Sequence, residues 1–201
     1  MTEVDEIKKA AAEKPTLAEA KNAISTLIRW IGENPNREGL IDTPDRVIKS
    51  YEELFSGYKA DPVEVLKKTF SDIANYDEMI LVKSIRVESY CEHHMIPIIG
   101  VAHVAYIPNK KIVGISKLAR VVEIFAKRLQ TQELLTVQIA NTINDTLKPK
   151  GVAVLIEAAH QCMTTRGVHK TDSATITSKM IGDFKNDNDL KKDFLCRINN
   201  K

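Results

Sequence analysis

Hydrophobic residues recur at helical spacing in the N-terminal third of the chain. After Thr16, a residue type that commonly caps helices, apolar side chains lie three and four positions apart and predict a helix. A second helix is predicted from Thr43 and Pro44, because threonine caps helices and proline is well tolerated in the first turn. Residues 16–75 are therefore expected to form an N-terminal helical segment, preceded by a flexible, charged lead-in at residues 1–15.

From residue 76 to residue 201 the pattern changes to strands alternating with helices. The predicted strands are residues 79–90, 98–107, 112–115, 152–163 and 174–178. The predicted helices are one that follows Ser116 as its cap, one from about residue 131 to 147, and one from about residue 190 to 198. The turn at residues 108–111 predicts that the second and third strands pair as a hairpin. We expect an α+β fold in which an antiparallel four-stranded sheet carries helices on one face.

Alternation within the first of these strands assigns its two faces. Met79, Leu81, Ile85 and Val87 are predicted to share one face, with Lys83 as a polar exception. A four-stranded sheet of this kind has an uncovered side and open edges, and pairing between subunits is a common way of covering such edges. We therefore predict a homo-oligomer.

Composition narrows the class of protein. Of 201 residues, 43% are hydrophobic and 28% are charged, which is typical of a globular chain. The net charge is only +2, so the bulk charge does not predict binding to nucleic acid or to a membrane surface. No apolar run approaches the ~18 residues of a membrane span, and residues 1–15 lack the apolar core of a signal peptide. Three cysteines do not predict a disulfide framework, and we expect a reducing, cytoplasmic setting.

Residue types that bind metals gather in two short stretches, each at the end of a predicted strand. The sequence CEHH occupies residues 91–94, and HQC occupies residues 160–162. Cys91 and His94 are three positions apart, a spacing at which a tight turn aims both side chains at one Zn²⁺. The histidine and cysteine of the second stretch are two apart, so in an extended chain they project from the same face. Together the two stretches predict a zinc site.

Two arrangements of zinc ligands fit these residues. Three protein ligands with a fourth position left for water form the catalytic arrangement, and four protein ligands form the structural one. The first uses Cys91, His94 and Cys162, and it leaves His93 and His160 as proton carriers. The second adds His160 to the ligands and makes His93 an ordinary polar neighbour. Spacing alone leaves both arrangements open.

Several cationic side chains are candidate phosphate contacts. Ser116, Lys117 and Arg120 lie at the start of a predicted helix, where unpaired backbone N–H groups and the helix dipole favour anions. Arg166 precedes Gly167, a residue that lets the backbone turn close to a ligand. Each of these residues taken alone is also compatible with a solvated surface position.

Two further pairs have both a functional and a structural interpretation. Arg46 and Lys49, three apart on the second predicted helix, form another basic pair, although such residues are mostly solvated. Gln132 and Glu133 are candidates for recognising a base, because a carboxylate accepts two N–H bonds from a guanine edge. In the structural interpretation, the negative charge of Glu133 stabilises the start of its helix.

Several of these motifs occur together in one order. They are TPDR at residues 43–46, CEHH at 91–94, GISKLAR at 114–120, QTQE at 130–133, HQCM at 160–163 with RG at 166–167, and SAT at 173–175. In order and spacing they resemble the GTP cyclohydrolase I family, from about Leu17 to the C-terminus. Leu134 departs from the family pattern, because many members have Arg after the Gln-Glu pair, and we expect this difference to change packing only.

The resemblance implies a zinc-dependent hydrolase that converts GTP and water into 7,8-dihydroneopterin triphosphate and formate, the first step of folate and pterin biosynthesis. It also implies the tunnelling fold and a homodecamer of two pentameric rings, with active sites at subunit junctions. It assigns the zinc to Cys91, His94 and Cys162. Proton transfer is assigned to His93, at purine N7, and to His160, at the sugar-ring oxygen.

The same resemblance implies that the remaining candidates bind GTP. The expected purine contacts are Ser116, Gln132 and Glu133, and the expected triphosphate contacts are Lys117, Arg120 and Arg166. The basic residues expected to come from a neighbouring subunit are Arg46 and Lys49. Two alternatives are testable: a related zinc enzyme of purine or pterin chemistry would give another product from GTP, and a non-catalytic zinc-stabilised assembly module would release no formate.

Overall fold

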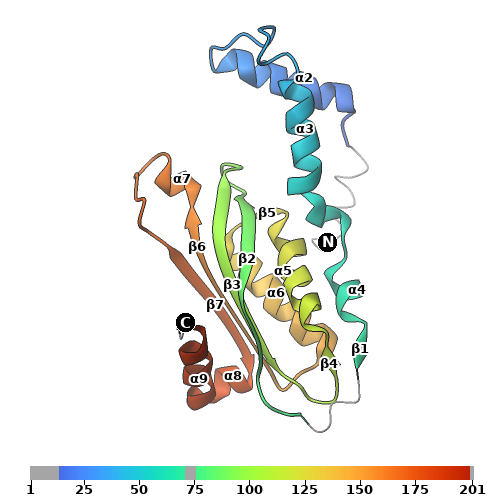
Figure 1. Ribbon diagram of the computed structural model, residues 1–201, viewed down its shortest axis with the longest axis vertical. Helices are drawn as coiled ribbons and strands as arrows, with labels where there is room; N and C mark the ends of the chain where they lie inside the picture. Colours follow the sequence, from blue (N-terminus) through green and yellow to red (C-terminus); the bar gives the residue numbers. More distant parts are fainter. Residues whose placement is uncertain (1–13, 71–75, 200–201) are drawn as a thin grey trace. The chain divides into compact units, whose positions relative to one another are not determined.

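The computed structural model of the protein describes residues 14–70 and 76–199 (Figure 1). The chain divides into two compact units, Met1–Glu53 and Leu54–Lys201. Most of the predicted flexible lead-in at residues 1–15 lies outside the described residues. In the part of the chain that is described, no helix is both long enough and apolar enough to cross a membrane.

Two helices, α2 (Leu17–Trp30) and α3 (Thr43–Leu54), make up the described part of the first unit. The predicted cap of α2 is confirmed, because Thr16 Oγ1 accepts a hydrogen bond from the backbone N–H of Glu19 at 3.2 Å. The Glu19 carboxylate in turn accepts a bond from the Thr16 N–H at 2.8 Å. These reciprocal bonds satisfy two N–H groups that have no partner within the helix itself.

A five-stranded sheet forms the centre of the second unit, in the order β5-β2-β3-β6-β7. Its strands are β2 (Ile80–Cys91), β3 (Pro97–Ile107), β5 (Leu129–Gln130), β6 (Gly151–His160) and β7 (Thr175–Gly182). Strands β2, β3, β6 and β7 pair antiparallel, which confirms the predicted four-stranded sheet. The additional strand, β5, is two residues long and pairs parallel with the end of β2.

Helices cover both faces of this sheet, whereas the sequence predicted helices on one face (Figure 1). The helices of the first face are α5 (Ile115–Ala126) and α6 (Gln132–Leu147). Those of the opposite face are α8 (Asp183–Asn186) and the terminal helix α9 (Asn188–Asn199). The predicted α+β class is confirmed. The prediction that helices cover only one face is wrong, because α8 and α9 pack on the opposite face.

The alternation of side chains along β6 explains how both faces are buried. Val154 and Ile156 point into the core under α5 and α6. Ala153 and Leu155 point the other way and join a second core around Phe184. The Phe184 ring stacks edge-to-face on Phe194 of the terminal helix, with 5.9 Å between the ring centroids. The sequence pattern marks β6 as apolar on both faces, and a strand of that kind needs a cover on each side.

A β-bulge in β2 changes the faces that the sequence assigned to this strand. The register against β3 shifts between Val82 and Ile85, and Ser84 has a positive φ of 58°. As a result, Met79 and Leu81 pack in the second core. Ile85 joins the first core instead. The prediction that all four apolar residues share one face is therefore wrong, because a bulge shifts the alternation by one position.

The predicted hairpin after β3 is also wrong. Strand β4 (Ile112–Val113) pairs antiparallel with β1 (Thr69–Phe70) in a separate two-stranded sheet. The contact of this segment with β3 is made through a side chain: the Val113 N–H donates a hydrogen bond to the buried Tyr106 hydroxyl at 3.1 Å. The 3₁₀ helix η1 (Ser56–Lys59) and the helix α4 (Pro62–Leu66) precede these strands.

Two element boundaries differ from the sequence prediction in ways that bear on function. Helix α5 begins at Ile115 with Gly114 as its N-cap, so Ser116 lies within the first turn and does not cap it. Strand β6 ends at His160, and the short helix α7 (Gln161–Thr164) follows it. The predicted strand 152–163 is therefore too long.

We predict that His103, which is buried in β3, makes the stability of the fold depend on pH. Burial lowers the pKa of His103, a nearby Glu157 raises it, and Lys83 lowers it. Because the folded state then favours the neutral imidazole, the stabilisation is present above the unfolded pKa of about 6.5 and is lost as the pH falls below it. Urea unfolding of the wild type should show this loss between neutral and mildly acidic pH.

The matched variant is His103→Gln, which keeps an acceptor for the Ser84 N–H, 3.4 Å from the His103 ring nitrogen. It should lose less stability than the wild type over the same pH interval. His169→Gln, at an exposed position, is the control and should behave like the wild type. An equal loss of stability in the wild type and His103→Gln would contradict the prediction.

Candidate active site

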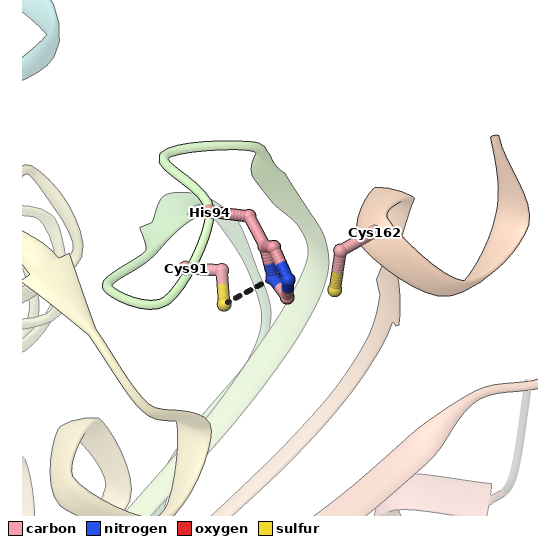
Figure 2. A group of neighbouring side chains, drawn as sticks. All are labelled: Cys91, His94 and Cys162. Atoms are coloured by element: carbon pink, nitrogen blue, oxygen red, sulfur yellow. Dashed lines mark hydrogen bonds between the residues drawn. The ribbon is translucent and has the colours of Figure 1, made fainter. Parts of the chain in front are cut away.

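The turn that follows β2 holds two of the predicted metal ligands. The backbone N–H of Met95 donates to the Cys91 carbonyl at 2.7 Å, and the N–H of Cys91 donates to the Ile96 carbonyl at 2.9 Å. Met95 has a positive φ of 55°, which reverses the chain tightly. The turn brings the Nδ1 atom of His94 to 4.0 Å from the Cys91 sulfur (Figure 2).

The third predicted ligand, Cys162, reaches the same place from α7. Strands β3 and β6 pair with Ile98 opposite His160, so the end of β6 lies beside the beginning of β3. Helix α7 continues from there and carries Cys162 toward the His94 ring (Figure 2). The ligand atoms of Cys91, His94 and Cys162 all lie within 4.8 Å of one another. The proximity arises from strand pairing and a helical turn, and not from the extended geometry that the sequence suggested.

Two sulfurs and one imidazole form a donor set that suits zinc. Cys91 is only 6% exposed, whereas His94 is exposed and Cys162 is half-buried, so the group is open on one side. Burial and the neighbouring Cys91 raise the pKa of the Cys162 thiol, and Arg166 lowers it. A divalent cation reverses this balance, because coordination deprotonates a thiol. The donor set and its open side therefore fit a metal ion.

His160 is not part of the ligand group, which argues against the four-ligand structural site. Its Nε2 atom lies 2.8 Å from Oε1 of Gln132, the first residue of α6. Burial lowers the pKa of His160, and the nearby Glu133 raises it. His160 thus lies two residues before Cys162 in the chain, and its ring is held by the first residue of α6.

His93 and Arg166 lie at the exposed side of the ligand group. The His93 side chain is exposed, and its Nε2 is 3.8 Å from the Glu92 carboxylate. The Arg166 guanidinium contacts Nε2 of His94 at 3.1 Å and leaves Nδ1 of that ring on the side of Cys91. Gly167 follows with a positive φ of 66°, as the sequence suggested for a close turn of the backbone. One cation and one further imidazole therefore border the metal group.

Other predicted contacts do not reach the metal group within one chain. Lys127, at the C-terminal end of α5, pairs with Glu88 of β2 at 3.6 Å. Ser116 lies at the opposite end of this helix, about 16 Å from Lys127 along the helix axis at a rise of 1.5 Å per residue. Lys117 and Arg120 lie on the same helix, and Arg120 lines a groove of about 300 Å³ between α5 and β2. The substrate roles of these three residues remain predictions.

The remaining predicted contacts are placed as follows. Arg46 and Lys49 are exposed on α3 in the first unit, where Arg46 pairs with Asp42 at 3.0 Å. Glu133 is exposed in the first turn of α6, and Gln132 beside it is fully buried. The family resemblance implied that Gln132 contacts the purine. Its bond to His160 was not predictable, because no local pattern signals a contact between a helix start and the end of a distant strand.

A family model and relatives of high sequence identity agree on one family. Residues 20–199 match the family model described as GTP cyclohydrolase I. GTP cyclohydrolase 1 of Maricaulis maris is 59% identical over 182 residues, covering 90% of this chain and 89% of that protein. GTP cyclohydrolase 1 of Brucella abortus is 57% identical over 185 residues, covering 92% of this chain and 87% of that protein. A solved structure, the archaeosine synthase QueF-Like in the apo form, aligns with a TM-score of 0.41 at 17% identity, over 52% of this chain and 93% of that one.

We predict that the protein binds about one zinc ion per chain and that Cys162→Ala loses it, because the ligand set drops from three side chains to two. His160→Ala should keep the metal, since this histidine lies outside the ligand group. Cys196→Ala, which removes the exposed cysteine of α9, is the matched control and should also keep it. Elemental analysis of the purified proteins measures all three, and full zinc content in Cys162→Ala would reject the ligand set.

Proposed function

The chain belongs to the GTP cyclohydrolase I family, and on this premise we propose that it hydrolyses the imidazole ring of GTP, releases formate and forms 7,8-dihydroneopterin triphosphate. The observation that carries the proposal is the group of Cys91, His94 and Cys162, within 4.8 Å of one another and flanked by two further histidines. Hydrolysis of a purine ring requires an activated water and groups that move protons, and this end of the sheet offers residues for both tasks.

The three ligands would hold Zn²⁺, which lowers the pKa of a bound water toward ~7 and so supplies a nucleophile at neutral pH. Buried Cys91 and half-buried Cys162 place two negatively charged ligands on the inner side of the site. His94 completes the set from the exposed side. Thiolate ligands persist in a reducing compartment, so we propose a cytoplasmic setting for the enzyme.

Two imidazoles carry the protons in this proposal. His93, exposed beside Glu92, protonates N7 of the purine and makes C8 open to attack by water. His160, held by α6, serves the sugar-ring oxygen in the later rearrangement. Loss of formate then leaves an amine that closes on the opened ribose. Histidine suits both tasks because it gains and releases a proton near neutral pH.

Charged residues from several parts of the chain are proposed to bind the two ends of GTP. Glu133 is exposed at the start of α6 and is proposed to accept two N–H bonds from the guanine edge. Arg166, next to His94, is proposed to bind the triphosphate, because a guanidinium forms strong paired bonds with phosphate oxygens. Lys117 and Arg120 are proposed to bind the triphosphate as well, and Ser116 the purine.

Because the α5 residues lie far from the metal group of their own chain, we propose that each active site is shared between copies in a homodecamer of two pentameric rings. The sheet supports this arrangement, since β2 pairs with β5 only at Tyr90 and Cys91, and no strand of the described chain pairs with the outer edge of β7. Such open edges favour strand pairing between copies. Arg46 and Lys49 are proposed to come from a neighbouring copy too.

We predict that the zinc-loaded wild type releases formate from GTP and that His93→Ala binds GTP but loses about 100-fold or more in formate release, the usual contribution of a general acid. Formate assay, pterin fluorescence after oxidation and GTP binding measure the three quantities. His169→Ala, another exposed histidine, is the control and should turn over normally. Turnover of His93→Ala at the wild-type rate would reject its role, and no formate from the wild type would reject the function.

A mixing experiment tests the shared site. Cys162→Ala lacks a metal ligand and Arg120→Ala lacks a cation of α5, so each alone should be nearly inactive. In co-expressed mixtures, up to about a quarter of the sites combine an intact metal group from one copy with an intact α5 from another, and activity should return. Cys162→Ala mixed with His93→Ala is the control and should stay inactive, because each site takes both of these residues from one chain and every chain in the mixture lacks one of them. Failure of the first mixture to regain activity would contradict sharing.

A further inference from the structure

The side chain of Gln132 is held in one orientation behind His160. Gln132 is fully buried, and its Nε2 lies 2.9 Å from the Thr175 carbonyl oxygen and 3.1 Å from the Ile156 carbonyl oxygen. Carbonyl oxygens only accept hydrogen bonds, so the end of the amide that faces them must be the NH₂ group. The opposite end, which faces His160, must therefore be the oxygen.

This orientation determines which nitrogen of His160 carries a hydrogen. The Gln132 oxygen can only accept, so the Nε2 atom of His160, 2.8 Å away, must donate. In the neutral ring the other nitrogen, Nδ1, then carries the lone pair. Within the described part of the chain, Nδ1 of His160 has no hydrogen-bond partner. It is the ring nitrogen left to exchange a proton with a bound molecule.

Two threonines close the network and hold the amide in place. The Thr136 hydroxyl donates to the backbone carbonyl of Gln132 at 2.7 Å, which uses the single hydrogen of that hydroxyl. Thr177, 2.7 Å away, must therefore donate to Thr136, and it accepts from the Gln132 amide at 3.2 Å. Turning the amide over would place its oxygen against two carbonyl oxygens in a buried position, an arrangement in which neither side finds a donor.

We propose that Gln132 is a positioning residue that keeps His160 in the tautomer with hydrogen on Nε2, so that Nδ1 is the atom that exchanges the proton with the substrate. The catalytic half of this inference rests on the proposed function. It differs from the sequence prediction that Gln132 binds the purine, because both hydrogens of the buried amide already have acceptors within the chain.

Nitrogen NMR of the zinc-loaded wild type, with ¹⁵N-labelled histidine, tests the tautomer directly. The resonances of His160 are identified by their loss in His160→Gln. In the neutral ring, Nε2 should carry the hydrogen and Nδ1 should show the shift of a nitrogen with a lone pair. Hydrogen on Nδ1 instead would overturn the proposal, and this result does not depend on any substitution of Gln132.

Steady-state kinetics with GTP test whether turnover depends on the positioning of His160 by Gln132. Gln132→Met removes the acceptor at similar length, and kcat should fall about 100-fold with zinc content and KM for GTP close to the wild type, because the ring is no longer held in its productive orientation. Gln138→Met removes an amide from the same helix, one that bonds to Gln130, and is the matched control with near-normal kcat. An unchanged kcat, or a raised KM at normal kcat as expected for a purine contact, would overturn the proposal.

The two hypotheses fail in different ways. If the wild type releases no formate from GTP, the proposed function is rejected while the NMR spectrum still decides the tautomer. If the wild type is active and Gln132→Met turns over normally, the positioning role is rejected while the function stands.

Discussion

The antiparallel pairing of β2, β3 and β6 is the constraint on which the candidate active site depends. Tyr90 lies opposite Pro97 and Ile98 opposite His160, so the end of β2, the beginning of β3 and the end of β6 meet at one end of the sheet. The turn after β2 and the short helix after β6 both leave from this place. Cysteines that are far apart in the sequence thereby come within reach of one ion. A shift of this register by one residue would turn His160 to the other face of the sheet.

The same end of the sheet is reinforced by α6. Thr131 caps this helix, and Gln132 in its first turn reaches both β6 and β7 through its amide. The Glu92 N–H also donates to the Gln130 carbonyl at 3.0 Å, which ties the metal-binding turn to the residues just before α6. Hydrogen bonds to residues near the start of α6 thus hold both the metal-binding turn and His160. Side chains placed by regular elements keep their geometry better than side chains on long loops.

Much of the fold was predictable because its signals are local. The first helix follows from its cap, Thr16, and from the helical spacing of its apolar residues, and the alternation of apolar residues gives the long strands. The bulge at Ser84 was not predictable, because serine has no strong preference for a positive φ and nothing in the pattern marks the shift. The partner of β4 was not predictable either, since alternation indicates a strand but does not say which strand it pairs with.

In the candidate site, too, local features were predictable and contacts between distant parts of the chain were not. Cys91 and His94 belong to one local turn, and their spacing indicated a metal only together with the second stretch at residues 160–162. The second stretch, at residues 160–162, added Cys162, and the family resemblance chose the three-ligand arrangement over the one that includes His160. The local geometry was misplaced, because Cys162 reaches the group through pairing between distant strands and a helix start, and not from an extended strand. Gln132 was predicted as a site residue, but its bond to His160 was not. That bond forms only when α6, β6 and β7 are packed together.

The central claim is that two sulfurs and one imidazole bind a single zinc ion and leave its fourth position free of side chains. X-ray absorption spectroscopy at the zinc edge of the loaded protein tests it most directly. We predict two sulfur ligands at about 2.3 Å, a single imidazole and no second histidine. A spectrum with two imidazoles beside the sulfurs, or with fewer than two sulfurs, would contradict it.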